Sequence, residues 1–87
     1  MLEKVVTLKQ EKNLKSLLKM FHHSQQEIER TDEYSIFTLQ VRPTFDFQQE
    51  ILSMGSDVEV LAPDWFRSDM AERVRLMWNN YFALADA

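Results

Sequence analysis

Apolar residues recur along the chain at two different spacings, and these spacings divide it into predicted strands and helices. The run Val5-Val6-Thr7-Leu8 is short and β-branched, which is typical of a strand. Asn13 then offers an N-cap side chain, and apolar residues follow at helical spacing as far as the segment 22–24. The residues of this stripe, which predict a first helix, are Leu14, Leu17, Leu18 and Phe21.

Residues 26–42 predict a β-hairpin. Ile28 is the only apolar residue in segment 26–30, whereas segment 34–42 alternates apolar side chains with polar and mixed ones. Thr31-Asp32-Glu33 between them suits a turn. Because a central strand buries more of its length than an edge strand, we expect the first arm at the edge of a sheet and the second arm in its centre.

The second half of the chain predicts a helix, a strand and a final helix. Pro43 and Thr44 precede helix 45–54, whose buried stripe is Phe47, Ile51 and Met54. Gly55, the only glycine, stands where a helix needs a left-handed cap, and strand 57–61 follows it. Pro63 and Asp64 open a final helix that runs to about Ala83. Its apolar stripe is Met70, Val74, Met77, Trp78 and Tyr81.

This order of elements predicts an α+β fold, a ferredoxin-like βαββαβ sandwich with an additional C-terminal helix, in which the first and third strands are central. We expect residues 1–87 to form a single domain with one core that includes Trp65, Trp78 and several phenylalanines. The strand residues expected to face the helices are Val6, Leu8, Phe37, Leu39, Val41, Val58 and Val60. Those expected on the open face of the sheet are Val5, Thr7, Ile36, Thr38 and Leu61.

Composition and charge exclude several classes of function. The chain has no cysteine, so it offers neither disulfides, thiolate catalysis nor a cysteine zinc site. Its net charge is -4, and a globally acidic chain does not attract nucleic acid through its overall field. No stretch approaches the roughly 20 apolar residues of a membrane span, and the N-terminus lacks the apolar run of a signal peptide. We therefore expect a cytoplasmic protein that makes no membrane contact.

Catalytic and metal-binding patterns are missing from the sequence. His22 and His23 are adjacent, so on a helix they point about 100° apart and cannot both ligate one metal ion. A single glycine cannot build a phosphate-binding loop, and no serine lies in a nucleophile-elbow pattern. The predicted open sheet face also lacks the aromatic side chains on which RNA-binding sheets stack bases. We expect no enzyme activity, no cofactor and no metal site.

Two groups of basic residues are candidate contacts for phosphate, in either nucleic acid or a nucleotide. The first group lies at helical spacing and consists of Lys12, Lys15 and Lys19. The second group lies on the final helix and consists of Arg67, Arg73 and Arg75. The alternative interpretation of the lysines is a solvated face opposite the leucine stripe of the first helix. For Arg67, the alternative is an ion pair at the start of its helix.

Residues 54–67 carry a family resemblance. The order Gly55, two residues, Val58-Glu59-Val60-Leu61, Pro63, an aromatic residue and Arg67 resembles the signature of the WCX domain. This domain is the C-terminal extension that follows the WYL domain in bacterial transcriptional regulators. Met54 departs from the pattern, because the family often has tryptophan there, and a thioether can still fill core space. The resemblance implies the ferredoxin-like fold and a regulatory role rather than catalysis.

The resemblance further implies that this domain is the C-terminal part of a longer regulator, which binds DNA through a separate helix-turn-helix domain. The implied partners are a second copy of the chain or an upstream WYL domain, and a nucleic-acid or nucleotide effector. A stand-alone ferredoxin-like small-molecule sensor or adaptor is the alternative. An interface would use the open sheet face or the final helix, and its candidate residues are Val5, Ile36, Leu61, Leu76 and Phe82.

Overall fold

The computed structural model describes residues 3–12 and 21–85. Most of the expected first helix, including its leucine stripe, falls on residues 13–20 and lies outside the described residues. The described elements are β1 (Lys4–Glu11), β2 (Gln26–Arg30), β3 (Tyr34–Val41), α1 (Phe45–Ser53), the short 3-10 helix η1 (Gly55–Asp57), β4 (Val58–Ala62) and α2 (Asp64–Ala85).

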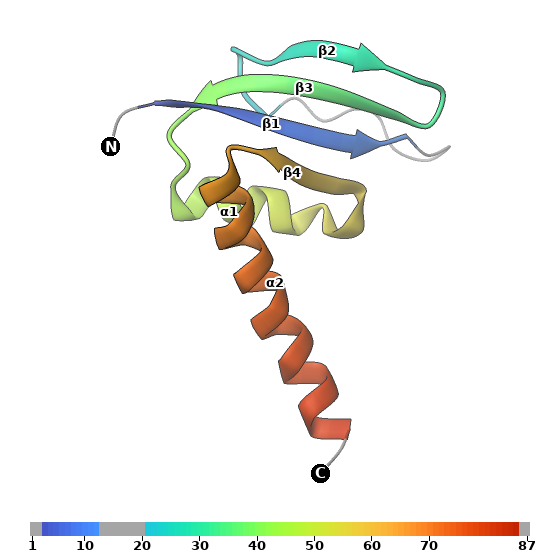
Figure 1. Cartoon of the computed structure of the whole chain (residues 1–87), viewed down its shortest axis with the longest axis vertical. Helices are drawn as coiled ribbons and strands as arrows, with labels where there is room; N and C mark the ends of the chain where they lie inside the picture. Colours follow the sequence, from blue (N-terminus) through green and yellow to red (C-terminus); the bar gives the residue numbers. More distant parts are fainter. Residues whose placement is uncertain (1–2, 13–20, 86–87) are drawn as a thin grey trace.

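The strands form one antiparallel sheet in the order β2-β3-β1-β4, so the fold is mixed α+β (Figure 1). β3 and β1 occupy the centre, and the weakly apolar β2 lies at an edge with every residue exposed. β1 runs three residues beyond the predicted strand end at Leu8. Its extension lies between two strands, since Gln10 pairs with Ser35 of β3 and with Val58 of β4. Backbone partners on both sides stabilise this extension although its residues are polar.

α1 packs against one face of the sheet, and the core lies between them (Figure 1). The burial of alternate strand residues agrees with the expected helix-facing set. The ring of Phe47 from α1 stacks on that of Phe66 from α2 at a centroid distance of 5.9 Å, and Phe21 meets Phe47 edge-on at 6.4 Å. The core residues are Val6, Leu8, Phe21, Phe37, Leu39, Val41, Phe47, Ile51, Val58, Val60, Phe66 and Met70.

The expectation that both tryptophans join the core was wrong. Trp65 and Trp78 are each about half exposed, whereas Phe66 is fully buried. The reason is the phase of α2, because Phe66 and Met70 are four residues apart and share the face that meets the sheet and α1. Trp65, one residue earlier, is rotated about 100° away from that face.

Local sequence signals explain both ends of α1. Thr44 is the N-cap residue, and its hydroxyl oxygen accepts a hydrogen bond from the Phe47 N–H at 3.4 Å. The C-cap is Met54, and Gly55 follows in the left-handed region with φ of +59°. The predicted left-handed glycine is therefore confirmed. Gly55 turns the chain at the end of α1, and η1 then leads into β4, which lies beside β1.

Gly55→Ala is expected to lower the free energy of unfolding by about 1 kcal/mol or more. A Cβ atom at this position would meet no heavy atom within 4 Å, so the cost comes from the backbone conformation alone. Gly55→Asn is the matched control, because asparagine tolerates the left-handed region better than alanine does. Urea unfolding midpoints measure both effects. Equal midpoints for the two variants would contradict this explanation.

Candidate functional site

A groove of about 610 Å³ lies where α2 leaves the body of the domain. Its walls come from the end of α1, from η1 and β4, and from the middle of α2. Figure 1 shows α2 continuing past this point, away from the sheet and α1. The apolar side chains that line the groove are Ile51, Leu52, Val58, Val60, Met70, Val74 and Trp78.

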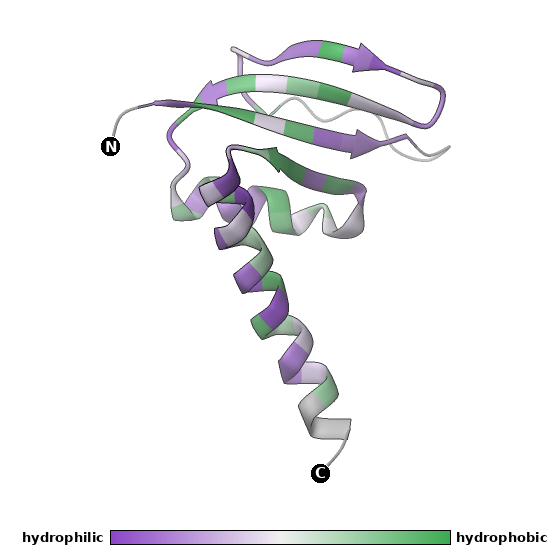
Figure 2. Cartoon of the chain, viewed as in Figure 1, coloured by the Kyte–Doolittle hydropathy of each residue, from purple (hydrophilic) through white to green (hydrophobic). Residues whose placement is uncertain are grey.

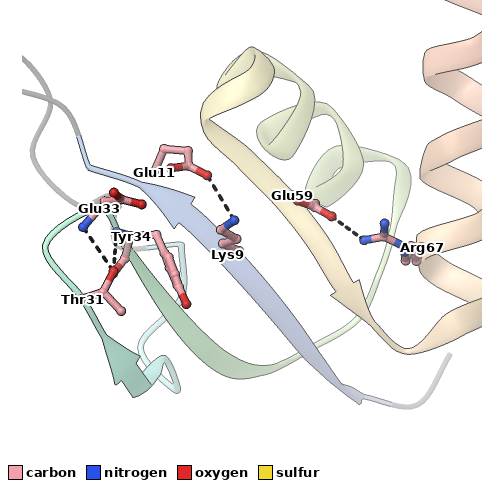
Figure 3. Close-up of polar contacts among 7 residues, drawn as sticks. All are labelled: Lys9, Glu11, Thr31, Glu33, Tyr34, Glu59 and Arg67. Atoms are coloured by element: carbon pink, nitrogen blue, oxygen red, sulfur yellow. Dashed lines mark hydrogen bonds and ion pairs between the residues drawn. The ribbon is translucent and has the colours of Figure 1, made fainter.

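The start of α2 is fixed to the body by packing and by one charged side chain. Phe66 and Met70 belong to the core. The guanidinium of Arg67 donates one hydrogen bond to the Glu59 carboxylate at 2.7 Å and another to the Val60 carbonyl at 2.6 Å (Figure 3). Because Glu59 and Val60 belong to β4, these bonds join α2 to the edge of the sheet and close one end of the groove.

The second half of α2 has no comparable packing. Of the predicted stripe, only Met70 is buried, and Tyr81 reaches 77% exposure. Apolar positions nevertheless continue along the helix (Figure 2). The rings of Trp78 and Phe82 stack on each other at 4.4 Å. This exposed stripe meets the groove at Val74 and Trp78. We call the stripe the α2 surface and define it by Val74, Met77, Trp78, Tyr81 and Phe82.

The three candidate arginines of α2 do not form one group. Arg67 and Arg75 line the groove, whereas Arg73 lies on the opposite side of the helix, where its Nε donates to the Gln48 side chain of α1 at 2.7 Å. Arg75 donates to Glu72 at 3.0 Å, and this hydrogen bond holds the pKa of the Glu72 carboxyl below its usual value. Each guanidinium therefore already has an oxygen partner, and it keeps further N–H donors.

The candidate lysine stripe is only partly described, because Lys15 and Lys19 lie outside the described residues. Lys12 follows the end of β1 and is not helical. Its ammonium donates to the Thr31 carbonyl at 2.7 Å, and its backbone N–H donates to the Glu33 carbonyl at 2.8 Å. Lys12 thus joins β1 to the β2–β3 turn.

The arrangement expected for the two histidines was wrong. Residues 22–24 are not helical and include a turn, and the ring centroids of His22 and His23 lie 4.1 Å apart with the ring planes tilted by 32°. His22 Nδ1 and the Ser24 hydroxyl form a hydrogen bond of 2.7 Å, and that hydroxyl accepts the Gln40 N–H of β3 at 2.8 Å. This serine therefore attaches the turn to the sheet.

The described residues contain no cluster of three or more acidic or histidine side chains that could hold a metal ion. Neither of the two helices seen over residues 3–12 and 21–85 is long and apolar enough to cross a membrane.

The five candidate interface residues lie in two places. Val5, on the sheet face opposite α1, is exposed, and Ile36 and Leu61 are half-buried. Leu76 and Phe82 are both about half exposed on α2. Sequence reasoning missed that Val74, Met77, Trp78 and Tyr81 are exposed as well. A signal was present in the sequence, since α2 carries six charged residues in segment 64–75 and none in segment 76–85.

A protein-family model matches most of the elements described above. A search of curated proteins found no match for this chain. The model of the WCX domain family matches residues 5–78, from β1 to the middle of α2, so the distal end of α2 lies beyond the match. The matched range covers most of the chain and includes the segment from Gly55 to Arg67. The chain therefore belongs to the WCX domain family, a family of regulatory-associated domains.

Proposed function

We propose that this chain is a non-catalytic regulatory and assembly module of a WYL-type bacterial transcriptional regulator. In this role it contacts a partner surface, and a change in that contact alters DNA binding by upstream domains. Such coupling requires that the contact be stronger in one state of the regulator than in another. The proposed place of action is the cytoplasm.

The single observation that carries this proposal is the α2 surface with its adjoining groove. Monomeric proteins rarely expose contiguous apolar patches larger than a few hundred Å², and larger ones mark binding sites. Here five apolar side chains, each about half exposed or more, continue the stripe that begins in the core. A domain that contacted no partner would gain nothing from exposing these apolar side chains.

The fold we propose for the complete domain is the ferredoxin-like βαββαβ sandwich with α2 as its additional helix. The strand order β2-β3-β1-β4 is compatible with it. In that fold the connection from β1 to the edge strand β2 passes the central strand β3 as a crossover.

Nucleic acid or a nucleotide is the effector that the family role suggests, with Lys12, Lys15, Lys19 and the arginines of α2 as candidate contacts. Each described member of these two groups already donates a hydrogen bond to a carboxylate, amide or carbonyl oxygen. The carboxylates of Glu59 and Glu72 offset part of the charge with which Arg67 and Arg75 would attract a phosphate. Protein contact through the α2 surface is therefore better supported than phosphate binding.

A small-molecule sensor is the second candidate function, and the groove favours it. Its volume of about 610 Å³ and its apolar lining with Arg67 and Arg75 suit a drug-sized amphipathic ligand. In the variant Val74→Trp the larger side chain fills the groove. The sensor function predicts a ligand that raises the unfolding temperature of the wild type but not that of this variant.

The regulatory proposal predicts a change in DNA binding when the α2 surface is altered in the full-length gene product. Trp78→Glu is expected to change the affinity for target promoters by about 5-fold or more, the range of typical coupling energies. Ile28→Glu is the matched control, because Ile28 is equally exposed but lies on the edge strand β2. Quantitative DNA binding by the purified variants measures the effect. Wild-type affinity in both variants would reject the coupling.

A further inference from the structure

The groove beside α2 faces a single stripe of that helix. Each α2 residue in its lining lies three or four positions from another, so all of them share one helix face. The step of 11 residues from the first to the last corresponds to about 16 Å along the helix axis. The groove is therefore elongated. Its α2 residues are Arg67, Met70, Ala71, Val74, Arg75 and Trp78.

The floor of this groove is the surface of the hydrophobic core. Ile51, Val58 and Met70 line it and are themselves buried. Val74 and Trp78 line it too, and each is about half exposed. An apolar chain lying in the groove would cover these two side chains against a floor that already exists. An apolar space of about 610 Å³ with a few polar groups is typical of a small-molecule site.

Arg67 lies at one end of the stripe and is prepared to bind an anion there. Its hydrogen bonds to the Glu59 carboxylate (Figure 3) and to the Val60 carbonyl both come from Nη1. Within the described parts of the chain, its Nε and Nη2 donate to no other residue. This edge of a guanidinium can bind a carboxylate through two parallel hydrogen bonds. Because β4 already holds Nη1, the edge is positioned before a ligand arrives.

The charges around the groove favour a ligand with one negative charge. Its lining includes Arg67, Arg75 and Glu59, which gives a balance of +1 in a chain whose net charge is -4. Arg75 already binds the two oxygens of Glu72 through Nε and Nη2, so Arg67 is the better placed donor. A carboxylate with an apolar chain suits this balance better than a phosphate group, since its charge is smaller and the buried chain contributes most of the binding free energy.

We infer that the groove binds a small-molecule monocarboxylate with an unbranched apolar chain. Its carboxylate accepts hydrogen bonds from Nε and Nη2 of Arg67, and its chain lies between α2 and β4 as far as Trp78. With C–C bonds of about 1.5 Å, an extended chain advances by about 1.3 Å per carbon, so the groove takes roughly 10 to 12 carbons. The inference rests on the sensor function proposed above and names its ligand class. Val74 and Trp78 also belong to the α2 surface, so an occupied groove changes what that surface offers a partner.

Isothermal titration calorimetry of the 87-residue chain tests the ligand class with decanoate, 1-decanol and decylamine, each below its micelle concentration. We expect decanoate to bind at least about 10-fold more tightly than decanol, because its hydrogen bonds to Arg67 are charge-assisted. Decylamine should bind most weakly, because it places a cation beside a guanidinium. Octanoate should bind roughly 15-fold more weakly than decanoate, since each buried CH₂ group contributes about 4-fold.

The variant Arg67→Lys separates recognition of the carboxylate from the shape of the groove. Lysine keeps the charge but lacks the planar edge. We therefore expect the decanoate affinity to fall at least about 10-fold, while the decanol affinity stays within about 2-fold of the wild type. Arg73→Lys is the matched control, because Arg73 lies on the opposite side of α2, and it should bind decanoate like the wild type. Val74→Trp, at an exposed position, should abolish binding of both ligands.

Three results would overturn the inference. They are equal affinities for decanoate and decanol in the wild type, decanoate binding that survives Arg67→Lys, and a parallel loss of both ligands in that variant, which would mean that Arg67 only shapes the groove. Decanol binding without a preference for decanoate would reject this ligand class and leave the sensor function standing. None of these measurements involves DNA, so the regulatory proposal can fail or hold separately.

Discussion

Phe66→Ala is expected to remove about 3 to 5 kcal/mol from the free energy of unfolding, the usual cost of truncating a buried aromatic side chain. Phe66 is fully buried and stacks on Phe47, so its loss leaves a cavity between α2, α1 and the sheet. A domain of this size is typically stable by about 4 to 13 kcal/mol. The variant is therefore expected to lose a large part of its folded population at moderate urea concentration.

Phe45→Ala is the matched control for this substitution. Phe45 is 59% exposed at the start of α1, and the Arg73 guanidinium lies over its ring at 5.0 Å. Its removal opens no cavity in the core, so we expect a cost of about 1 kcal/mol or less. Chemical denaturation followed by circular dichroism compares the two variants. Similar midpoints would mean that Phe66 does not anchor α2 to the core.

The parts of the fold that the sequence predicted well are those fixed by local chemistry. Gly55 was predicted to be left-handed because it follows a helical stripe and precedes an alternating strand, and its φ of +59° confirms it. The two faces of β3 follow from alternation alone, and Phe37 and Leu39 are buried as predicted. Thr44 capped α1 as its position suggested.

The parts that the sequence predicted poorly depend on contacts between distant segments. The length of β1 depends on backbone partners from both β3 and β4, which its own polar residues do not reveal. Trp65 and Phe66 are adjacent aromatic residues, and only the packing angle of α2 decides that Phe66 is the buried one. The turn at His22 and His23 likewise depends on the hydrogen bond between Ser24 and Gln40.

In the candidate site, too, local sequence predicted some features, and others depend on contacts between distant segments. The sequence correctly placed an apolar stripe on the final helix, but periodicity cannot tell whether the matching surface belongs to the same chain or to another one. Phe66 and Met70, in the half of α2 that meets the body of the domain, are buried, and the apolar residues in the half that extends beyond it are exposed. The partners of the arginines are also tertiary, since Arg67 reaches Glu59 on a strand and Arg73 reaches Gln48 on another helix.

The central claim is that the two halves of α2 are stabilised differently, the first by the domain itself and the second through contact with a partner. An isolated helical segment of about ten residues is marginal in water. In the dilute monomer we therefore expect the amides of residues 77–82 to exchange with solvent at least about 100-fold faster than those of residues 68–72, which Phe66 and Met70 hold to the core. A partner bound to the α2 surface should remove most of that difference by mass action.

Residue-resolved hydrogen exchange, compared between the dilute 87-residue chain and the full-length gene product, is the measurement that tests this claim most directly. We predict that residues 77–82 are protected in the full-length wild type and in its Ile28→Glu variant, and that protection stays low in full-length Tyr81→Glu. Equal protection of both halves of α2 in the dilute monomer would contradict the claim, because the helix end would then be stable without a partner. Protection that stayed low in the full-length wild type would contradict contact with a partner through the α2 surface.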